Sequence, residues 1–386
     1  MVDLCFSKPE SCCGCGACAC ICPQQAIRME YSDKGFKYPI IDQEKCVDCN
    51  ACVQVCDFKR FVPTDDKPEC YAARHKDSSE LETSRSGGFF MALCRQVIDN
   101  DGVVFGCIID KDMFVKHIYV DKYEECKQFK GSKYVQSDLM NTFNECLHFL
   151  ENDRHVLFSG TGCQIHGLLS FLKAKKAKME KLITVDIVCH GVPSPSVFKR
   201  YIDEVQKKKK CRIEQIDFRD KSLNGWADHI EKYDTDKGDE FYSKNWTNVF
   251  YRHILFRESC YSCKYTTTNR KSDFTIADYW GIGKNAPEFD DNRGCSLVLI
   301  QSEKARIVFN EIKEYLEFKK TNIEKSLQPQ LIKPIWKGWD YNYFWRRYKK
   351  NPSKTINMFF FPNRITKGFW KTERGAKDII KKVLRK

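Results

Sequence analysis

The sequence predicts an α+β fold with a small cysteine-rich part at residues 1–65, a larger α/β part at 84–320 and a basic aromatic segment at 331–386. One cysteine spacing occurs twice in the first part. The large part alternates apolar runs of strand length with amphipathic runs of helix length, separated by glycine-rich turns. The last segment holds 16 Lys and Arg against 3 Asp and Glu, which equals the net charge of +13, so the residues before it are neutral on balance.

The composition predicts a folded cytoplasmic protein without a membrane-spanning helix. Hydrophobic residues make up 42% and charged residues 30% of the 386 residues, and no apolar run reaches the ~18 residues of a membrane helix. The first residues lack the basic and then apolar pattern of a secretory signal. Because the chain is long and its 22 cysteines are closely spaced, we expect thiolates that hold metal rather than the disulfides of an exported protein.

Two cysteine runs near the N-terminus share the spacing C-x2-C-x2-C-x3-C, which is the pattern of bacterial ferredoxins with two 4Fe–4S clusters. In that pattern the fourth cysteine of each run ligates the other cluster. Zinc is the alternative, but it needs two well-separated cysteine pairs rather than a triple with a trailing fourth cysteine. The pattern predicts one cluster on Cys12, Cys15, Cys18 and Cys56, and another on Cys46, Cys49, Cys52 and Cys22.

The segment between the two runs predicts a β-hairpin that returns the chain to the second run. Two features depart from the ferredoxin pattern. Asp57 follows Cys56 where a proline is usual, and Cys13 and Cys20 are additional thiols that could compete as ligands. Neither departure removes a thiolate that the clusters need.

A polar, turn-rich stretch after Cys56 predicts a linker into the large part. Beyond it, glycine-rich turns lie at predicted helix starts, where the backbone approaches closely and the helix N-terminus favours phosphate. An ordinary tight turn is the alternative for each, but several beside iron–sulfur cysteines favour a dinucleotide such as FAD. The expected elements are a helix after Gly88, a strand after Gly102, strands at 156–158 and 183–188, and a helix after Pro195.

Four further cysteines predict a third cluster. Two of them follow predicted strand ends, which converge at one edge of a sheet, and the other two form a C-x2-C pair. The alternative for scattered cysteines is the role of a small buried hydrophobic residue. We expect that role for Cys94, Cys107, Cys126, Cys146, Cys211 and Cys295. The candidate ligands are Cys163, Cys189, Cys260 and Cys263.

A series of motifs in the large part resembles a known family. In order they are SGGFFMAL, KGSKYVQSDL, FSGTGCQIHGL, VDIVCHGVPSPSVFKRYI, FRDKSLNGW, CYSCKY and SDFTIADYWGI. Over Ser84 to Lys320 the chain is similar to the beta subunits of coenzyme F-420 hydrogenases and dehydrogenases, which often carry a ferredoxin domain in front. Gly162 stands where the family usually has proline, which loosens a turn without removing a ligand.

The resemblance implies an iron–sulfur flavoprotein oxidoreductase, with FAD and a 4Fe–4S cluster on the four cysteines of the large part. Family members pass electrons between a partner, such as ferredoxin or a hydrogenase or dehydrogenase subunit, and a hydride acceptor. The acceptor is a deazaflavin coenzyme in methanogens and another small molecule elsewhere. Clusters carry single electrons, and a flavin converts them to a hydride. By position, the flavin contacts are Ser86, Gly87, Gly88, Lys133, Tyr134, Ser159, Gly160 and Thr161.

Two residues are candidates for catalysis. His190 could donate a proton near the flavin N5, hydrogen-bond a cluster sulfur, or serve the structure alone. Lys133 could neutralise flavin phosphates or a reduced flavin, or lie solvated at the surface. Asp278 in ADYWG could hold a turn or a positive group, and it is assigned no chemistry.

The basic segment combines Trp and Phe with Lys and Arg, which suits docking to a membrane surface or an acidic partner. The alternative is that its aromatic residues pack on the main part while its lysines stay solvated. Nucleic acid is disfavoured because no nucleic-acid motif accompanies the charge. The stretch 377–386 could form a short amphipathic helix. Two alternatives to an enzyme remain: a non-catalytic electron-transfer subunit, and an accessory protein of surface-polysaccharide synthesis at the cytoplasmic face of a membrane.

Overall fold

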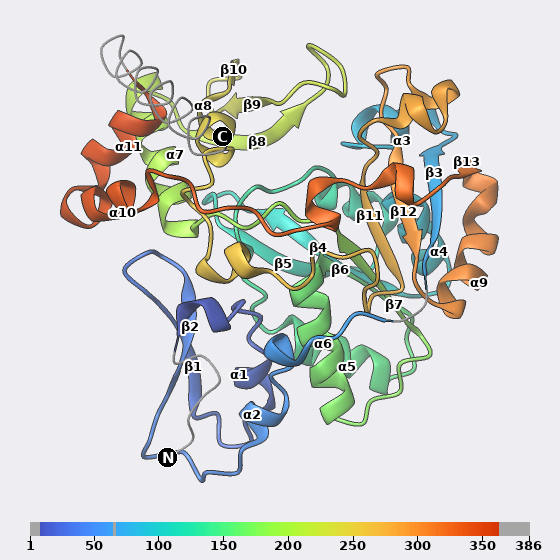
Figure 1. The fold of residues 1–386 in the computed structure, drawn as a ribbon, viewed down its shortest axis with the longest axis horizontal. Helices are drawn as coiled ribbons and strands as arrows, with labels where there is room; N and C mark the ends of the chain where they lie inside the picture. Colours follow the sequence, from blue (N-terminus) through green and yellow to red (C-terminus); the bar gives the residue numbers. More distant parts are fainter. Residues whose placement is uncertain (1–7, 65–66, 363–386) are drawn as a thin grey trace, which may run out of the picture.

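The computed structural model describes residues 8–64 and 67–362, and its N-terminal unit is the domain at the bottom of Figure 1. The elements of this unit are α1 (Ala17–Ile21), β1 (Ile27–Tyr31), β2 (Lys37–Ile41) and α2 (Ala51–Gln54). The strands β1 and β2 form the expected antiparallel hairpin between the cysteine runs. Gly16 and Asn50 precede the two helices in the left-handed conformation, which turns each cysteine loop sharply into its helix.

The large part is built on one eight-stranded sheet (Figure 1). Its strands, in spatial order, are β13 (Leu316–Lys320), β3 (Glu69–His75), β12 (Ser296–Ile300), β11 (Phe274–Asp278), β7 (Leu182–Ile187), β6 (Val156–Thr161), β4 (Val103–Ile109) and β5 (Val115–Val120). The strands β11, β7, β6 and β4 run parallel to one another, and the pairings outside them are antiparallel. Both strands expected from the glycine-rich turns, at 156–158 and 183–188, lie among the parallel strands with slightly shifted bounds.

Helices cover both faces of this sheet (Figure 1). They are α4 (Phe89–Asp99) and α9 (Glu303–Ile312) on one face, and α5 (Thr142–Glu151) and α6 (Gly162–Ala174) on the other. Successive strand residues point to opposite faces, so Val104 packs with α4 and α9 whereas Val103 and Phe105 pack with α5 and α6. The central strands are continuous apolar runs because both of their faces are buried.

The stretch expected to be a linker is part of the large sheet, so that expectation is wrong. Strand β3 pairs with both β12 and β13, and Ala72 and Ala73 are fully buried there. The short helix α3 (Ser78–Thr83) follows, and Asp77 caps its first turn. The run ECYAARH has few large apolar residues, so its strand character depends on partners that lie far along the chain.

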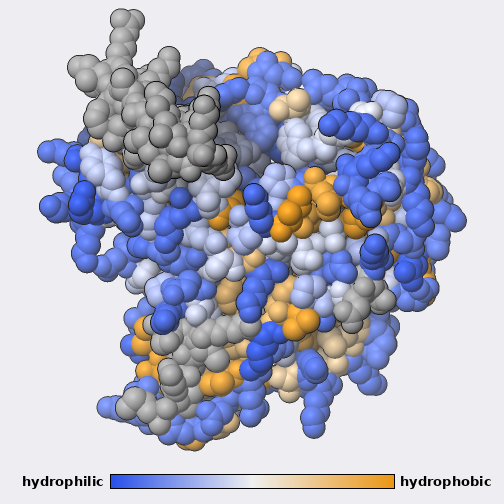
Figure 2. All heavy atoms as spheres, in the orientation of Figure 1, coloured by the Kyte–Doolittle hydropathy of each residue, from blue (hydrophilic) through white to orange (hydrophobic). Residues whose placement is uncertain are grey.

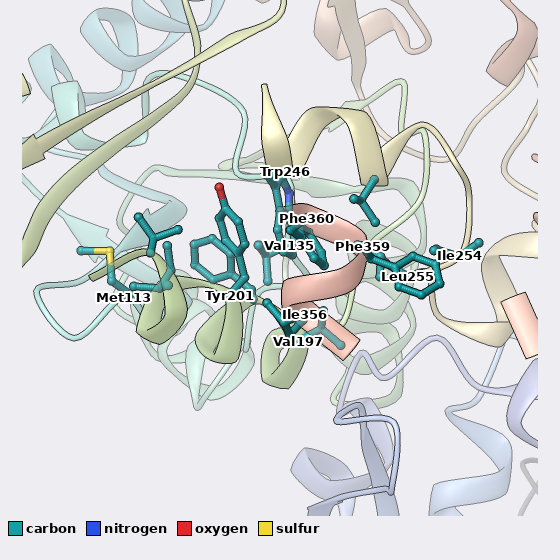
Figure 3. Close-up of a cluster of buried hydrophobic side chains, with 14 of the residues drawn as sticks. Met113, Val135, Val197, Tyr201, Trp246, Ile254, Leu255, Ile356, Phe359 and Phe360 are labelled. Carbon is teal, nitrogen blue, oxygen red and sulfur yellow. The ribbon is translucent and has the colours of Figure 1, made fainter. Parts of the chain in front are cut away.

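A second, three-stranded sheet stands beside the C-terminal helices. Its elements are β8 (Ile213–Asp220), β9 (Ile230–Thr235) and β10 (Glu240–Ser243), with α7 (Pro195–Lys209), α8 (Asn245–Phe250), α10 (Tyr341–Lys350) and α11 (Pro352–Phe360) packed around them. Trp246 of α8 lies at the centre of this core, against Tyr201 of α7 and Phe360 of α11 (Figure 3). The helix expected after Pro195 is therefore α7, and it connects the large sheet to this smaller core.

The described part of the basic segment packs against the main body. In α10 the side chains of Tyr341, Phe344 and Trp345 are buried, whereas Arg346 and Lys350 are exposed. This amphipathic pattern is that of a core-facing helix, and it matches the packing alternative rather than a separate tail. The expected helix at 377–386 lies outside the described residues. Among the described helices, none is both long enough and apolar enough to cross a membrane.

Glu258 forms hydrogen bonds that connect three parts of the fold. Its carboxylate accepts hydrogen bonds from Lys34 of the N-terminal hairpin turn at 2.5 Å, from Lys337 at 2.8 Å and from the hydroxyl of Tyr341 in α10. Burial alone raises the pKa of Glu258, but the bonds from Lys337, Lys34 and Tyr341 outweigh it and lower this pKa to about 2. The carboxylate therefore stabilises the fold at neutral pH.

Replacing Glu258 with glutamine should lower the free energy of unfolding by about 1–2 kcal/mol at pH 7, because charge-assisted hydrogen bonds are lost. The difference from wild type should be full above the ordinary Glu pKa of 4.5 and shrink as the pH falls toward 2, since protonation removes the same bonds. Chemical unfolding followed by Trp fluorescence measures it. The exposed pair Arg28–Glu30 supplies the control, because Glu30→Gln should change stability little. Equal losses in the two variants would contradict the prediction.

Candidate cysteine groups and cofactor cavity

Eight cysteines of the N-terminal unit gather in two groups. Each group combines cysteines of both runs, as the spacing predicts. The outer group borders one small cavity and consists of Cys22, Cys46, Cys49 and Cys52. The inner group borders another and consists of Cys12, Cys15, Cys18 and Cys56. Each group thus takes three thiols from one run and the fourth from the other.

A backbone amide points at a sulfur of the outer group. The Ala26 N–H donates to the Cys22 Sγ at 3.3 Å. Amides that point at a sulfur favour a metal-bound thiolate. Among residues 8–64 and 67–362, no three His, Cys, Asp or Glu side chains converge tightly enough for a single metal ion.

The four candidate ligands of the large part also come together, and we call them the third group: Cys163, Cys189, Cys260 and Cys263. Cys163 and Cys189 follow the ends of β6 and β7, which are parallel neighbours, so the two thiols lie at one edge of the sheet. Burial first, and then the nearby Cys163, raise the pKa of Cys189 to about 12. Burial and then Cys189 raise the pKa of Cys260 in the same way. Thiols that repel one another's negative charge at close range are stabilised by a bound cation.

The inner and third groups adjoin each other. Cys163 belongs to the third group and also borders the inner-group cavity. Gly167 of α6 lies against Cys15, and a Cβ at this position would come within 2.8 Å of the Cys15 Sγ. Cys13 lies between Cys15 and Cys163. The three groups therefore form a row from the outer group, through the inner group, to the edge of the large sheet.

A cavity of about 320 Å³ opens at the other side of the third group, and Cys189 lines it. This volume is within the usual range for a small-molecule site. Gly87 is the exception among the expected flavin contacts, because its N–H donates to the Ser296 Oγ at 3.0 Å and its carbonyl accepts from the His75 N–H at 2.7 Å. The expected contacts that line the cavity are Ser86, Gly88, Lys133, Tyr134, Ser159, Gly160 and Thr161.

Several buried polar atoms at this cavity have no hydrogen-bond partner within the described chain. Buried polar atoms are nearly always satisfied in native proteins, so a cluster of exceptions along one cavity wall indicates a ligand. The unpartnered atoms are Ser84 Oγ, Arg85 Nε, His117 Nδ1 and Arg219 Nε. Of these residues only Arg219 lies inside a motif of the family resemblance, FRDKSLNGW, and the motif alone does not assign it a ligand.

A second cavity of about 980 Å³ adjoins the first and shares Arg85, Lys133 and Arg219 with it. Cationic side chains predominate at the shared wall. The Lys133 ammonium donates to the backbone carbonyls of Gln128 and Lys130 at 3.0 and 2.8 Å. Burial lowers the pKa of Lys133 to about 8. The two cavities together offer an elongated site with positive charge near its middle.

One wall of the first cavity is aromatic. Trp280 stacks on Trp226 with ring centroids 4.6 Å apart, and the Arg219 guanidinium lies 5.0 Å above the Trp280 ring. Asp278 fixes this wall, since it forms an ion pair with Arg219 and accepts from the Trp226 Nε1 at 3.0 Å. Asp278 thus holds a positive group, which is one of the two roles expected for it.

His190 lines the cavity directly after Cys189. Its Nε2 lies 2.9 Å from the Nε2 of His253, so one of these two atoms must carry the hydrogen of the bond. Burial and then His253 lower the pKa of His190 to about 4. The imidazole is therefore neutral at pH 7, where it can donate or accept a hydrogen bond but is not an imidazolium acid.

Comparisons with known proteins match two separate stretches of the chain. Residues 11–59 match the 4Fe-4S dicluster domain, and residues 153–326 match the C terminus of the coenzyme F420 hydrogenase/dehydrogenase beta subunit. Among solved structures, a chain of the F420-reducing [NiFe] hydrogenase complex from Methanosarcina barkeri is similar. It shares 16% sequence identity at a TM-score of 0.47, over 77% of this chain and 93% of that chain. No curated protein matches the chain.

Proposed function

This chain joins a 4Fe–4S dicluster domain to the C-terminal domain of the coenzyme F420 hydrogenase/dehydrogenase beta-subunit family, and from this premise we propose that it is an iron–sulfur flavoprotein oxidoreductase. Electrons enter at the outer group, pass to the inner and third groups, and leave as a hydride from FAD to a small-molecule acceptor. One observation carries the proposal: Cys189 belongs to the third group and also lines the cavity.

The three cysteine groups are the proposed ligands of three 4Fe–4S clusters. Each group supplies the four thiols that one cubane cluster needs. Gly14 and Gly167 lie against the inner group without side chains of their own, and this lets the protein close tightly around it. Cys12 and Cys18 of the inner group are buried, and the other cysteines of the inner and third groups are half-buried.

The two adjoining cavities are the proposed FAD site. A bound flavin supplies the conversion between single electrons and a hydride. Arg85, His117 and Arg219 offer buried polar atoms to it, and Lys133 offers a positive charge. Trp280, which stacks on Trp226, lines one wall with flat apolar surface. His190, neutral at pH 7, is placed to hold a hydrogen bond at the cavity end nearest Cys189.

The outer group is the proposed entry for electrons from a partner protein. Cys49 is exposed, and Val47, which borders the same outer-group cavity, is 60% exposed. Figure 2 shows hydrophobic residues over the N-terminal unit and also over the middle of the large part, on a surface that is mainly hydrophilic elsewhere. The alternative of a membrane-side accessory protein rests on Trp336 and Trp339, which are 68% and 44% exposed.

Purification without oxygen, followed by assays of iron, sulfide and flavin, tests the proposal. We expect about twelve irons per chain from three cubane clusters together with one FAD. About eight irons and no flavin would overturn the third cluster and the flavin site. The non-catalytic electron-transfer subunit would then be the better assignment.

The pKa of Lys133 predicts how FAD affinity depends on pH. A protonated lysine attracts the flavin phosphates, so affinity should fall as the pH rises above about 8. Replacing Lys133 with methionine should weaken binding about tenfold at pH 7, equivalent to ~1.4 kcal/mol, and flatten this pH dependence.

Fluorescence titration with FAD on both sides of about pH 8 measures both effects. Lys133→Arg is the control, because its charge persists across this range and its affinity should not fall. Identical curves for wild type and Lys133→Met would contradict the assignment of Lys133 to the flavin phosphates.

A further inference from the structure

Arg257 is a buried arginine at the boundary between the N-terminal unit and the large part. It lies just before the turn that carries Cys260, and only 1% of its surface is exposed. Its guanidinium reaches into the loop of the inner group. Nε donates to the Cys12 carbonyl at 2.8 Å, and Nη2 donates to the Lys37 carbonyl at 3.0 Å and lies 3.5 Å from the Cys12 Sγ. Nη1 donates to the Gln136 Oε1 at 3.1 Å.

The loop of the inner group is shaped around this side chain. Gly14 has a positive φ of 76°, and a Cβ there would come within 2.8 Å of the Arg257 Nη1. The Tyr38 ring stacks on the guanidinium with its centroid 4.1 Å away. The position is therefore built for a flat cation next to Cys12.

Arg257 has no carboxylate partner among residues 8–64 and 67–362. Its hydrogen bonds go to neutral oxygens and to a cysteine sulfur. Among the other buried arginines, Arg270 lies 3.3 Å from a carboxylate oxygen of Asp186 and Arg219 pairs with Asp278. Arg85 resembles Arg257, because it donates only to backbone carbonyls, and it lines the cavity proposed for FAD. A buried cation without an anion is strongly unfavourable.

The carboxylate that borders the inner-group cavity is already engaged. Asp57 borders the inner-group cavity and is paired with Arg60 at 2.7 Å. The anion that Arg257 needs must therefore come from the cysteine thiolates themselves and from what they bind.

We propose that Arg257 is the counter-charge of the inner cluster and raises its reduction potential above that of the outer cluster. The inference rests on the proposed function, since it requires a cluster on Cys12, Cys15, Cys18 and Cys56. Four thiolates make a cluster anionic, and reduction adds one more negative charge. A fixed buried cation therefore stabilises the reduced form more than the oxidised form, which raises the potential.

The surroundings of the outer group have the opposite character. Cys49 is exposed, so water screens charges near it, and the carboxylate of Asp48 lies 3.9 Å from the Cys46 Sγ. A nearby carboxylate disfavours added negative charge. The difference between the groups makes electron transfer from the outer to the inner cluster favourable. Arg257 acts through the reduction potential of the inner cluster and does not touch a substrate.

Potentiometric titration monitored by electron paramagnetic resonance tests this in the full chain. Arg257→Gln should shift the inner reduction equilibrium about tenfold toward the oxidised form, which is 59 mV for a one-electron couple. Arg257→Lys should keep most of the wild-type potential, because it keeps the charge. The outer potential should stay unchanged in both variants. Arg60→Gln is the matched control, since it removes an exposed arginine near the same cavity and should shift the inner potential much less.

Two results would overturn the proposal: an unchanged inner potential in a fully loaded Arg257→Gln protein, or loss of the inner cluster's iron in both Arg257 variants, which would mean that the side chain acts by packing. Iron loss in Arg257→Gln that Arg257→Lys restores would support it, because charge is what the two variants do not share. A wild-type chain without the inner cluster's iron would instead refute the proposed function, before Arg257 is in question.

Discussion

Replacing Cys260 and Cys263 together with serine should remove about four irons per chain and leave about eight on the N-terminal unit. Electrons delivered to the outer cluster should then no longer reach the flavin. The physical reason is that Cys260 and Cys263 supply half of the third group, and a cubane cluster does not persist on two thiolates. Cys189 is the member of the third group that lines the cavity, so the row of thiols meets the cavity at this group.

Iron analysis and anaerobic reduction of the flavin by a chemically reduced ferredoxin, followed at the flavin absorbance, measure the two effects. FAD should still bind in the variant, since neither cysteine lines the cavity. Cys211→Ser is the matched control, because Cys211 lies just after the end of α7 and belongs to none of the three groups, so its loss should change neither iron content nor flavin reduction. Full iron in the double variant would exclude the third cluster from these ligands.

The ferredoxin-like grouping could be predicted because ligand spacing is a local property. Each cysteine run forms one loop, so the spacing that follows Cys12 and Cys46 fixes the local geometry of the ligands. The meeting of Cys163 and Cys189 was also predictable, since both follow strands that lie side by side in parallel. In these cases the sequence distance between partners is short, or a regular element fixes their direction.

The features that the sequence did not reveal depend on contacts between distant segments. Strand β3 could not be recognised because its character comes from pairing with β12 and β13. Arg257 stands beside a predicted ligand pair, yet nothing local indicates that its guanidinium reaches Cys12 in another domain. The unpartnered atoms of His117 and Arg219 likewise become visible only once the cavity exists. The charge of the C-terminal segment suggested a docking surface, whereas its aromatic residues decide its structure.

Replacing Trp246 with alanine should lower the free energy of unfolding by about 3–5 kcal/mol, which is the usual loss for a large aromatic side chain in a core. Trp246 is fully buried, and its ring packs against Phe198 and Phe360 with centroids 5.1 and 5.5 Å apart. Its Nε1 also donates to the Tyr134 carbonyl at 3.2 Å, which connects α8 to the wall of the cavity. The same variant should therefore bind FAD more weakly.

Chemical unfolding of wild type, Trp246→Ala and Trp336→Ala compares a buried tryptophan of the core with an exposed one of the C-terminal segment. Trp336 is 68% exposed, so its removal should change stability by less than about 0.5 kcal/mol. If Trp246→Ala were as stable as wild type, the contact of α8 with α7 and α11 would contribute nothing to the core. If it is destabilised as expected and loses FAD affinity as well, then the core around Trp246, to which Phe360 of α11 belongs, supports the cavity wall at Tyr134.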